Sequence, residues 1–183
     1  SLRSRSQKAS AVTTSGRSRA TARHSSSTRS PSLASARVFV PSSAEGSAPA
    51  RTALVGNPSD GYGGAVLSVT LPELGARARA TAGDAIVSSP PSVLVDAVAR
   101  RLGVQGAIDW STTIPEGVGL GGSSAIAIAV IRALCGLHGL ELGADEVAAL
   151  ALAAEREDLG IAGGRQDQVA EAYGGLMLMD FAR

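Results

Sequence analysis

Cysteine, aromatic residues and histidine are all scarce in this chain of 183 residues. Its single cysteine, Cys135, excludes an internal disulfide, and the apolar run around it indicates a small buried thiol. Aromatic residues make up only 3% of the chain, so the core has to be built from aliphatic side chains. The two histidines, His24 and His138, have no partners that would suggest a metal site or a catalytic triad.

Long apolar runs and a serine-hydrolase signature are also missing. No apolar stretch reaches the length of a membrane span without a charge or a glycine interrupting it. No serine lies in a Gly-x-Ser-x-Gly elbow, so hydrolase chemistry has no support in the sequence. The low cysteine content fits a reducing compartment, and we expect a cytoplasmic protein with no membrane partner.

The net charge of +1 hides two segments of opposite character. Residues 1–50 contain eight of the seventeen basic residues and one acid, Glu45, whereas residues 51–183 contain nine basic residues and fifteen acids. The first segment is rich in Ser and Arg with almost no hydrophobic pattern, so it cannot bury enough apolar surface to offset its conformational entropy. We therefore predict a disordered leader over 1–49 and an ordered domain over 50–183.

The leader leaves three interpretations open. An Arg- and Ser-rich, acid-poor segment is typical of an organelle transit peptide, which would place the protein in a plastid or a mitochondrion. A basic tail can also bind nucleic acid through the phosphates, but no aromatic residues interleave these arginines, and we expect no specific nucleic-acid partner. We favour the third interpretation, an unstructured leader without a targeting role.

Hydrophobic periodicity predicts strands first and clustered helices later, which is the pattern of an α+β fold. The helix over 123–137 is apolar nearly all round, which indicates a central buried helix. The alternation of Ala and Arg over 76–82 indicates a strand with one exposed face. The predicted strands are 51–57, 65–71, 76–82, 106–115 and 176–181, and the predicted helices are 91–103, 123–137, 143–160 and a short one within 160–175.

The stretch Ile114–Val130, IPEGVGLGGSSAIAIAV, places four glycines directly before this apolar helix. The first N–H groups of a helix have no partner within it and carry partial positive charge, which suits a phosphate. Glycine leaves no Cβ between amide and ligand, and the hydroxyls of Ser123 and Ser124 can hold a phosphate oxygen or a metal ion. The stretch predicts an anion site, although the glycines could also serve only a tight turn between strand and helix.

Two better-known phosphate loops do not fit this stretch. A Walker loop ends in Gly-Lys-Ser or Gly-Lys-Thr, and this loop ends in Gly-Gly-Ser-Ser. A dinucleotide fingerprint needs an acidic residue at the end of a second strand about 20 residues further on, where this chain is predicted to be helical.

Three stretches together resemble the GHMP kinases, the family of galactokinase, homoserine kinase and mevalonate kinase. Pro115–Ala125 is similar to the family's phosphate-binding motif, Ala50–Gly64 to its N-terminal substrate motif, and Ala154–Gly175 to its central acid-bearing segment. The resemblance is greatest to glucuronokinase-type sugar kinases. It implies the family's N-terminal domain, with a fold like domain 2 of ribosomal protein S5, and the cofactors ATP and Mg²⁺.

The resemblance assigns the glycine loop to ATP and two oxygen ligands to Mg²⁺. Ser123, the hydroxyl nearest the helix start, and Glu155 would hold the metal ion together with phosphates and waters. From the residues alone, Glu155 is better explained as an exposed acid on a helix surface, as we expect for Glu157 and Asp158. The residues that would contact ATP are Pro115, Gly117, Val118, Gly119, Leu120, Gly121, Gly122, Ser123, Ser124 and Ala125.

Asp167 and Arg51 match the aspartate and the arginine that the family places beside the transferred phosphate. Asp167 would accept or orient the proton of a sugar hydroxyl. Arg51 would stabilise the charge that develops and keep Asp167 ionised. From the residues alone, Asp167 could instead cap the helix that follows it, and Arg51 could be a surface residue at a strand end.

The resemblance places the sugar against Asp60, with Asn57, Ser59 and Tyr62 as neighbours and Asp167 opposite. Galactokinases carry Glu-His where this chain has Asn57-Pro58. A sugar acid brings its own carboxylate, which a Glu would repel in a low-dielectric site, so Asn57 favours a uronic acid. We therefore predict ATP-dependent phosphorylation of a sugar, with the anomeric hydroxyl of glucuronate as the preferred acceptor.

Several alternatives remain open. The protein could be another GHMP kinase acting on galactose, arabinose or a heptose, a non-catalytic relative that senses its ligand, or an inactive fragment. Members of the family have a second half that carries much of the substrate cleft. We therefore expect this chain to be the N-terminal part, with faces left open to solvent. The sequence does not decide the oligomeric state.

Overall fold

The computed structural model describes residues 41–182, and most of the predicted leader lies outside this range. These residues form five strands and four α-helices, with a 3₁₀ turn at Ser59–Tyr62 and a π-helical turn at Ala154–Asp158. The strands are β1 Ser43–Val55, β2 Ala65–Thr81, β3 Ile86–Ser89, β4 Gly106–Thr112 and β5 Leu176–Asp180. The helices are α1 Val93–Leu102, α2 Gly122–His138, α3 Ala144–Ala153 and α4 Gln166–Tyr173.

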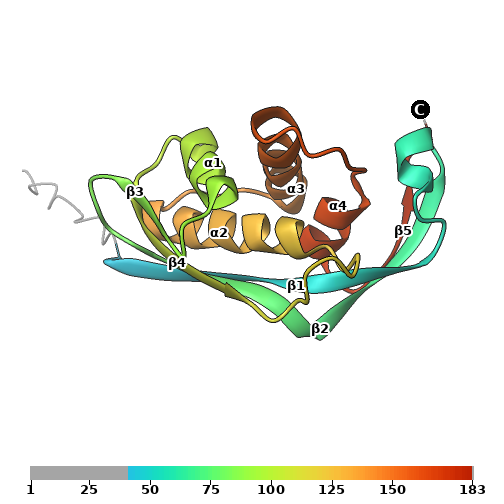
Figure 1. Cartoon of the computed structure of the whole chain (residues 1–183), viewed down its shortest axis with the longest axis horizontal. Helices are drawn as coiled ribbons and strands as arrows, with labels where there is room; N and C mark the ends of the chain where they lie inside the picture. The colour runs from blue at the N-terminus through green and yellow to red at the C-terminus, as the bar shows by residue number, and fades with distance from the viewer. Residues whose placement is uncertain (1–40, 183) are drawn as a thin grey trace, which may run out of the picture. The chain divides into compact units, whose positions relative to one another are not determined.

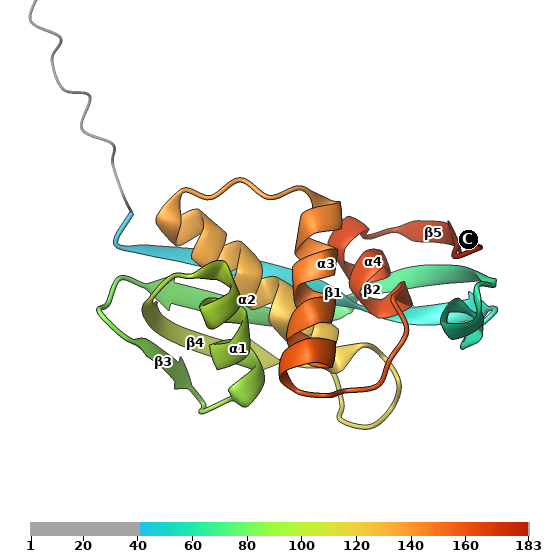
Figure 2. The ribbon, with the colours of Figure 1, turned by 90° about the horizontal axis from the view of Figure 1, so that it is seen from above.

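The five strands form one mixed sheet in the order β1-β2-β4-β3, with β5 paired to the first part of β2. Only the β3–β4 pair is parallel; the other pairs are antiparallel. All four helices lie on one face of this sheet, and α2 runs along its middle (Figures 1 and 2). The prediction of an α+β fold is therefore confirmed.

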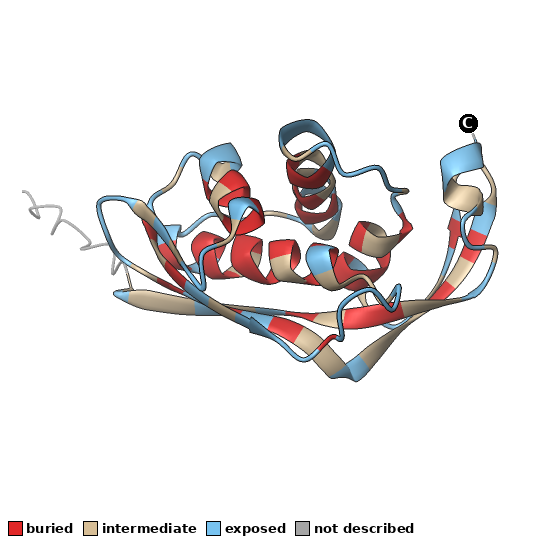
Figure 3. Ribbon diagram, in the orientation of Figure 1, coloured by how far each residue is buried: buried red, intermediate tan, exposed pale blue. Residues whose placement is uncertain are grey.

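Small side chains let α2 lie directly on the sheet. Ala48 and Ala50 of β1 and the alternating alanines of β2 are buried against alanines of α2. A Cβ at Gly46 would overlap the carbonyl of Ala129, so the helix backbone reaches the strand backbone at this point. The buried residues accordingly gather where α2 meets the sheet (Figure 3). The scarcity of aromatic residues follows from this close approach, because a ring would hold the two layers apart.

The predicted elements differ from the structure in four places. The two strands predicted over 65–71 and 76–82 are one continuous strand, β2, whose Arg77 and Arg79 face solvent as the alternation indicated. The short strand β3 was not predicted, because its four residues carry too little pattern. The helix predicted over 143–160 changes to a π-helical turn at Ala154. In addition, β1 begins at Ser43, before the predicted domain boundary at residue 50.

One end of the sheet exposes large apolar side chains. Leu176 and Leu178 of β5 are 67% and 71% exposed, and Leu54 and Val55 of β1 and Tyr62 also face solvent. Within residues 41–182, no helix combines the length and the apolar character needed to cross a membrane.

Truncating a side chain of α2 in the core should cost far more stability than truncating an exposed leucine. Leu134 is fully buried, so Leu134→Ala is expected to lower the free energy of unfolding by about 2–5 kcal/mol. Leu178→Ala, at an exposed position, should change it by less than about 0.5 kcal/mol. Urea denaturation followed by circular dichroism measures both. Equal losses in the two variants would contradict the packing described for α2.

Candidate active site

The glycine loop connects β4 to the first turn of α2. The backbone at Gly117, Gly119 and Gly121 has positive φ angles of 73°, 72° and 77°. Gly121 is the N-cap of α2, and among the described residues no side chain caps this end of the helix. The N–H groups of the first turn are therefore not satisfied by a capping side chain, as an anion site requires.

Arg51 of β1 ties this loop to the rest of the site. Its backbone N–H donates to the carbonyl of Leu120 at 3.2 Å, and its guanidinium donates to the carbonyl of Gly119 at 3.1 Å. The guanidinium also forms an ion pair with Asp167 of α4. Arg51 is only 4% exposed, so the predicted alternative of a surface arginine is wrong. A single buried side chain thus joins the glycine loop to the predicted catalytic aspartate.

Asp167 does not cap the helix in which it lies. The N-cap of α4 is Arg165, and the backbone N–H of Gln166 donates to Asp60 at 3.1 Å. The side chain of Asp167 is 29% exposed and points to Arg51, on the side of the glycine loop. It is therefore accessible from solvent and paired with a cation.

Ser123 and Ser124, in the first turn of α2, contact the predicted metal ligand Glu155. The hydroxyl of Ser123 donates to Glu155 Oε1 at 2.5 Å, and that of Ser124 lies 3.2 Å from both carboxylate oxygens. The amide of Gln168 donates to Glu155 and, at 3.1 Å, to Ser124. These hydroxyl and carboxylate oxygens are the hard donors that Mg²⁺ prefers, so the residues present fit the predicted metal ion.

The π-helical turn separates Glu155 from its acidic neighbours. Glu155 is 4% exposed, whereas Glu157 and Asp158 face outward and pair with Arg101 of α1. The alternative of an exposed helix-surface acid is therefore wrong for Glu155. Such π-helical turns are often found at functional sites, where the extra residue re-aims a side chain.

The predicted substrate residues fall into two groups. Asn57 and Asp60 reach the start of α4, where both accept from the side chain of Gln166. The hydroxyl of Ser59 instead donates to the carbonyl of Ala65, at the start of β2, at 2.9 Å. Tyr62 is 89% exposed. The fold thus brings Asn57 and Asp60, but neither Ser59 nor Tyr62, against the helix that carries Asp167.

Three buried polar residues of α4 were missed in the sequence. Gln166 and Gln168 flank Asp167 and support Asp60 and Glu155, respectively, and Glu171 lies one turn further along the helix. Glutamine and glutamate are seldom fully buried, and their spacing in a short helix does not show which face is covered. The signal was available only in part: the segment Ala154–Gly175, on which the resemblance rests, contains both glutamines, but nothing in it marks them as buried.

Glu171 is the least satisfied of these side chains. It is 1% exposed, and neither carboxylate oxygen has a hydrogen-bond partner within residues 41–182. Burial raises its pKa well above the ordinary value for a glutamate, the charge of Asp167 raises it further, and Arg51 partly offsets both. The carboxyl is therefore expected to remain protonated where exposed glutamates are ionised.

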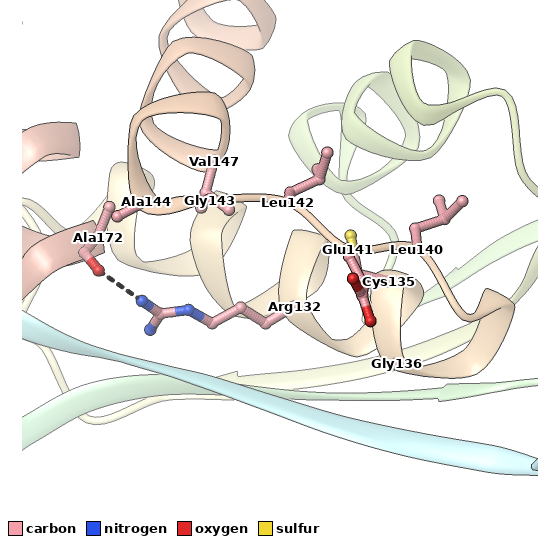
Figure 4. Close-up of a pocket in the computed structure, with 10 residues that line it drawn as sticks. All are labelled: Arg132, Cys135, Gly136, Leu140, Glu141, Leu142, Gly143, Ala144, Val147 and Ala172. Atoms are coloured by element: carbon pink, nitrogen blue, oxygen red, sulfur yellow. Dashed lines mark hydrogen bonds between the residues drawn. The ribbon is translucent and has the colours of Figure 1, made fainter.

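A cavity of about 570 Å³ lies elsewhere, between the end of α2 and the start of α3 (Figure 4). Arg132 lines it, but its guanidinium is already bonded to the carbonyls of Ser47 and Ala172. Cys135 also lines it, and burial raises the pKa of this thiol, which makes the thiolate less accessible. None of the predicted site residues borders this cavity, and the buried-thiol prediction for Cys135 is confirmed.

Comparison with known families gives a match over the part of the chain that carries the glycine loop and α4. Residues 91–175 match the model described as the GHMP kinases N terminal domain. This segment contains the glycine loop, Ser123, Glu155, Asp167 and Glu171.

Two curated relatives have named activities. The chain is 52% identical over 68 residues to D-glycero-alpha-D-manno-heptose 7-phosphate kinase of Campylobacter jejuni. The aligned residues cover 37% of this chain and 20% of that protein. It is 28% identical over 174 residues to Glucuronokinase 1 of Arabidopsis thaliana, covering 73% of this chain and 48% of that protein. The chain thus spans at most about half the length of these relatives.

Solved structures agree with this family match. A D-glycero-D-manno-heptose 1-phosphate kinase from Bacteriodes thetaiotaomicron superimposes with a TM-score of 0.64 at 28% identity. The superposition covers 76% of this chain and 56% of that one.

Neutralising Glu171 should make the domain more stable at high pH. A carboxyl whose pKa is raised on folding keeps its proton in the folded state while the unfolded chain loses it, so stability falls as pH rises between the two pKa values. Glu171→Gln is expected to remove this fall, for a gain of about 1–3 kcal/mol at the high end of the range. Urea denaturation at several pH values measures it, with Glu157→Gln as the exposed control. If the stability of Glu171→Gln fell with rising pH as much as that of Glu157→Gln, the burial argument would be contradicted.

Proposed function

Because this chain carries a GHMP kinase N-terminal domain, we propose that it supplies the nucleotide site and the acceptor base of an ATP-dependent sugar kinase. The observation that carries the proposal is the buried Arg51, which contacts the glycine loop on one side and Asp167 on the other. A base and a phosphate loop joined by one cation are what phosphoryl transfer to a hydroxyl needs.

In the proposed complex, the triphosphate of ATP lies along the glycine loop Pro115–Ala125. The uncapped first turn of α2 points its N–H groups at the phosphate oxygens. Ser123 and Glu155 would hold Mg²⁺, which would neutralise part of the phosphate charge when bound. Gln168 keeps the carboxylate of Glu155 oriented toward the two serines.

The transfer step places Asp167 against the acceptor hydroxyl. The hydroxyl proton moves to the carboxylate of Asp167, and the acceptor oxygen forms a bond to the γ-phosphorus as the bond from that phosphorus to the bridging oxygen of ADP breaks. Arg51 remains beside Asp167 and the transferred phosphoryl group, so its positive charge stabilises the negative charge on that phosphoryl group. With glucuronate as acceptor at its anomeric hydroxyl, the product is a sugar 1-phosphate.

A non-catalytic ligand sensor is the competing proposal from another class. A sensor needs the loop to hold a ligand, but it needs neither an ionised base nor a metal carboxylate. The chain retains Asp167 paired with Arg51 and Glu155 bonded to Ser123, and this combination favours the kinase.

Removing the proposed base should abolish transfer while nucleotide binding persists. Asp167→Asn is expected to lower kcat by about 10²–10⁴-fold, because the amide accepts no proton. A coupled assay of ATP consumption on the complete product of the reading frame measures this, and calorimetry with Mg-ATP measures binding. Asp109→Asn, at an exposed position of β4, is the matched control. Full activity of Asp167→Asn would exclude this residue as the base.

The chemistry of the acceptor loop favours an anionic sugar. Asn57 places an uncharged amide where a glutamate would repel a substrate carboxylate. Arg165, which precedes Gln166, lies 5.9 Å above the ring of Phe181 and has no acidic partner among residues 41–182. An unpaired cation beside the acceptor loop attracts a carboxylate or a phosphate, so a uronic acid, or a phosphorylated heptose as alternative, fits better than a neutral sugar.

The charge at these two positions should set the preference between sugars. Asn57→Glu and Arg165→Met are each expected to lower kcat/KM for glucuronate relative to galactose by about tenfold, through repulsion or through loss of attraction. Arg77→Met, on the exposed face of β2, should leave the ratio unchanged. Heptose phosphate, galacturonate and arabinose complete the panel. An unchanged ratio in both variants would argue against an anionic acceptor.

A further inference from the structure

Glu171 lies on the same face of α4 as Asp167, one helical turn away. Residues four apart on a helix are neighbours, and two like charges in this arrangement repel each other. Asp167 is engaged by Arg51, whereas both oxygens of Glu171 lack a partner within the described residues, as does Nε of Arg51. The proposed reaction makes no use of Glu171, although the chain buries it at considerable cost.

The carboxyl of Glu171 lies directly behind the glycine loop. A Cβ built on Gly121 would overlap the carboxyl group of Glu171 and would lie 3.4 Å from Cγ of Arg51. The N-cap of α2, Arg51 and Glu171 therefore meet at one point. Position 121 therefore requires glycine for two reasons. Its φ of 77° is unfavourable for other residues, and a Cβ would collide with the carboxyl of Glu171.

The charged groups around Glu171 come from each neighbouring element. Asp167 lies on its own helix, Arg51 on β1 and Glu155 on the π-helical turn. Helix α2 contributes Arg132, whose guanidinium is held by the carbonyls of Ser47 and Ala172. Of the acids around Glu171, only Asp167 is paired with Arg51.

We propose that Glu171 is a positioning residue that must be uncharged for the glycine loop to accept a nucleoside triphosphate, so that its ionisation weakens nucleotide binding. The inference rests on the proposed function, since it concerns the same loop. An ionised Glu171 would be an internal anion at the positive end of α2, where the phosphates are to bind, and it would compete with Asp167 for Arg51. When Glu171 is uncharged, the positive end of α2 is free for the nucleotide and Arg51 stays paired with Asp167.

The test compares Glu171→Gln with the original chain, using Mg-ATP as the ligand. Carbon-13 NMR of the glutamate carboxyls first gives the midpoint of Glu171, identified as the resonance absent from the variant. Calorimetry then gives the dissociation constant of Mg-ATP on both sides of that midpoint. At each pH, the ratio of the dissociation constants of the original chain and Glu171→Gln is taken. The protonation of the nucleotide affects both proteins equally, so it cancels in this ratio. Glu157→Gln, at an exposed acid, is the control.

We expect binding by the original chain to weaken about tenfold or more across the midpoint, while binding by Glu171→Gln changes little. Glu157→Gln should behave as the original chain. A Glu171 midpoint in the range of exposed glutamates, or an affinity ratio that does not change across the midpoint, would overturn the inference and leave the kinase proposal in place. Failure of all three proteins to bind Mg-ATP at any pH would overturn the proposed nucleotide site itself.

Discussion

The site depends on one buried cation. Arg51 is 4% exposed and bonded at the same time to the glycine loop and to Asp167. A buried guanidinium needs partners for its charge and its donors, so the loop and the aspartate are held at a fixed spacing. Arg51 lies on β1, an edge strand that is hydrogen-bonded to β2, and this fixed position gives the loop a precise place although four of the loop's residues are glycines.

The carboxyl groups of Asp167, Glu155 and Glu171 have three different environments. Asp167 is partly exposed and paired, which suits a base. Glu155 is buried but satisfied by two hydroxyls and an amide, which suits a metal ligand. Glu171 is buried without a partner, and its pKa is raised by burial and by its acidic neighbours. The surroundings, and not the residue type, separate their chemical roles.

The small residues of the core serve the same site. Because alanines line the contact between α2 and the sheet, the first turn of α2 comes close to β1, which carries Arg51. Larger core side chains would move the helix start away from Arg51 and break the hydrogen bonds between Arg51 and the loop. The aliphatic composition, which at first excluded an aromatic core, thus determines how closely the phosphate loop approaches its arginine.

The sequence by itself determined the α+β class, the buried character of α2, the position of the glycine loop and the family resemblance, because these are encoded in local periodicity and in contiguous motifs. It did not show that Asp60, rather than Asp167, accepts a hydrogen bond from the first backbone N–H of α4. Nor did it show that a π-helical turn buries Glu155, or that Glu171 lies behind Gly121. Those facts depend on contacts between residues far apart in the chain. The packing of α4 against β1, α2 and α3 decides which of its polar side chains are removed from water, and for Glu171 this burial raises the pKa of the carboxyl.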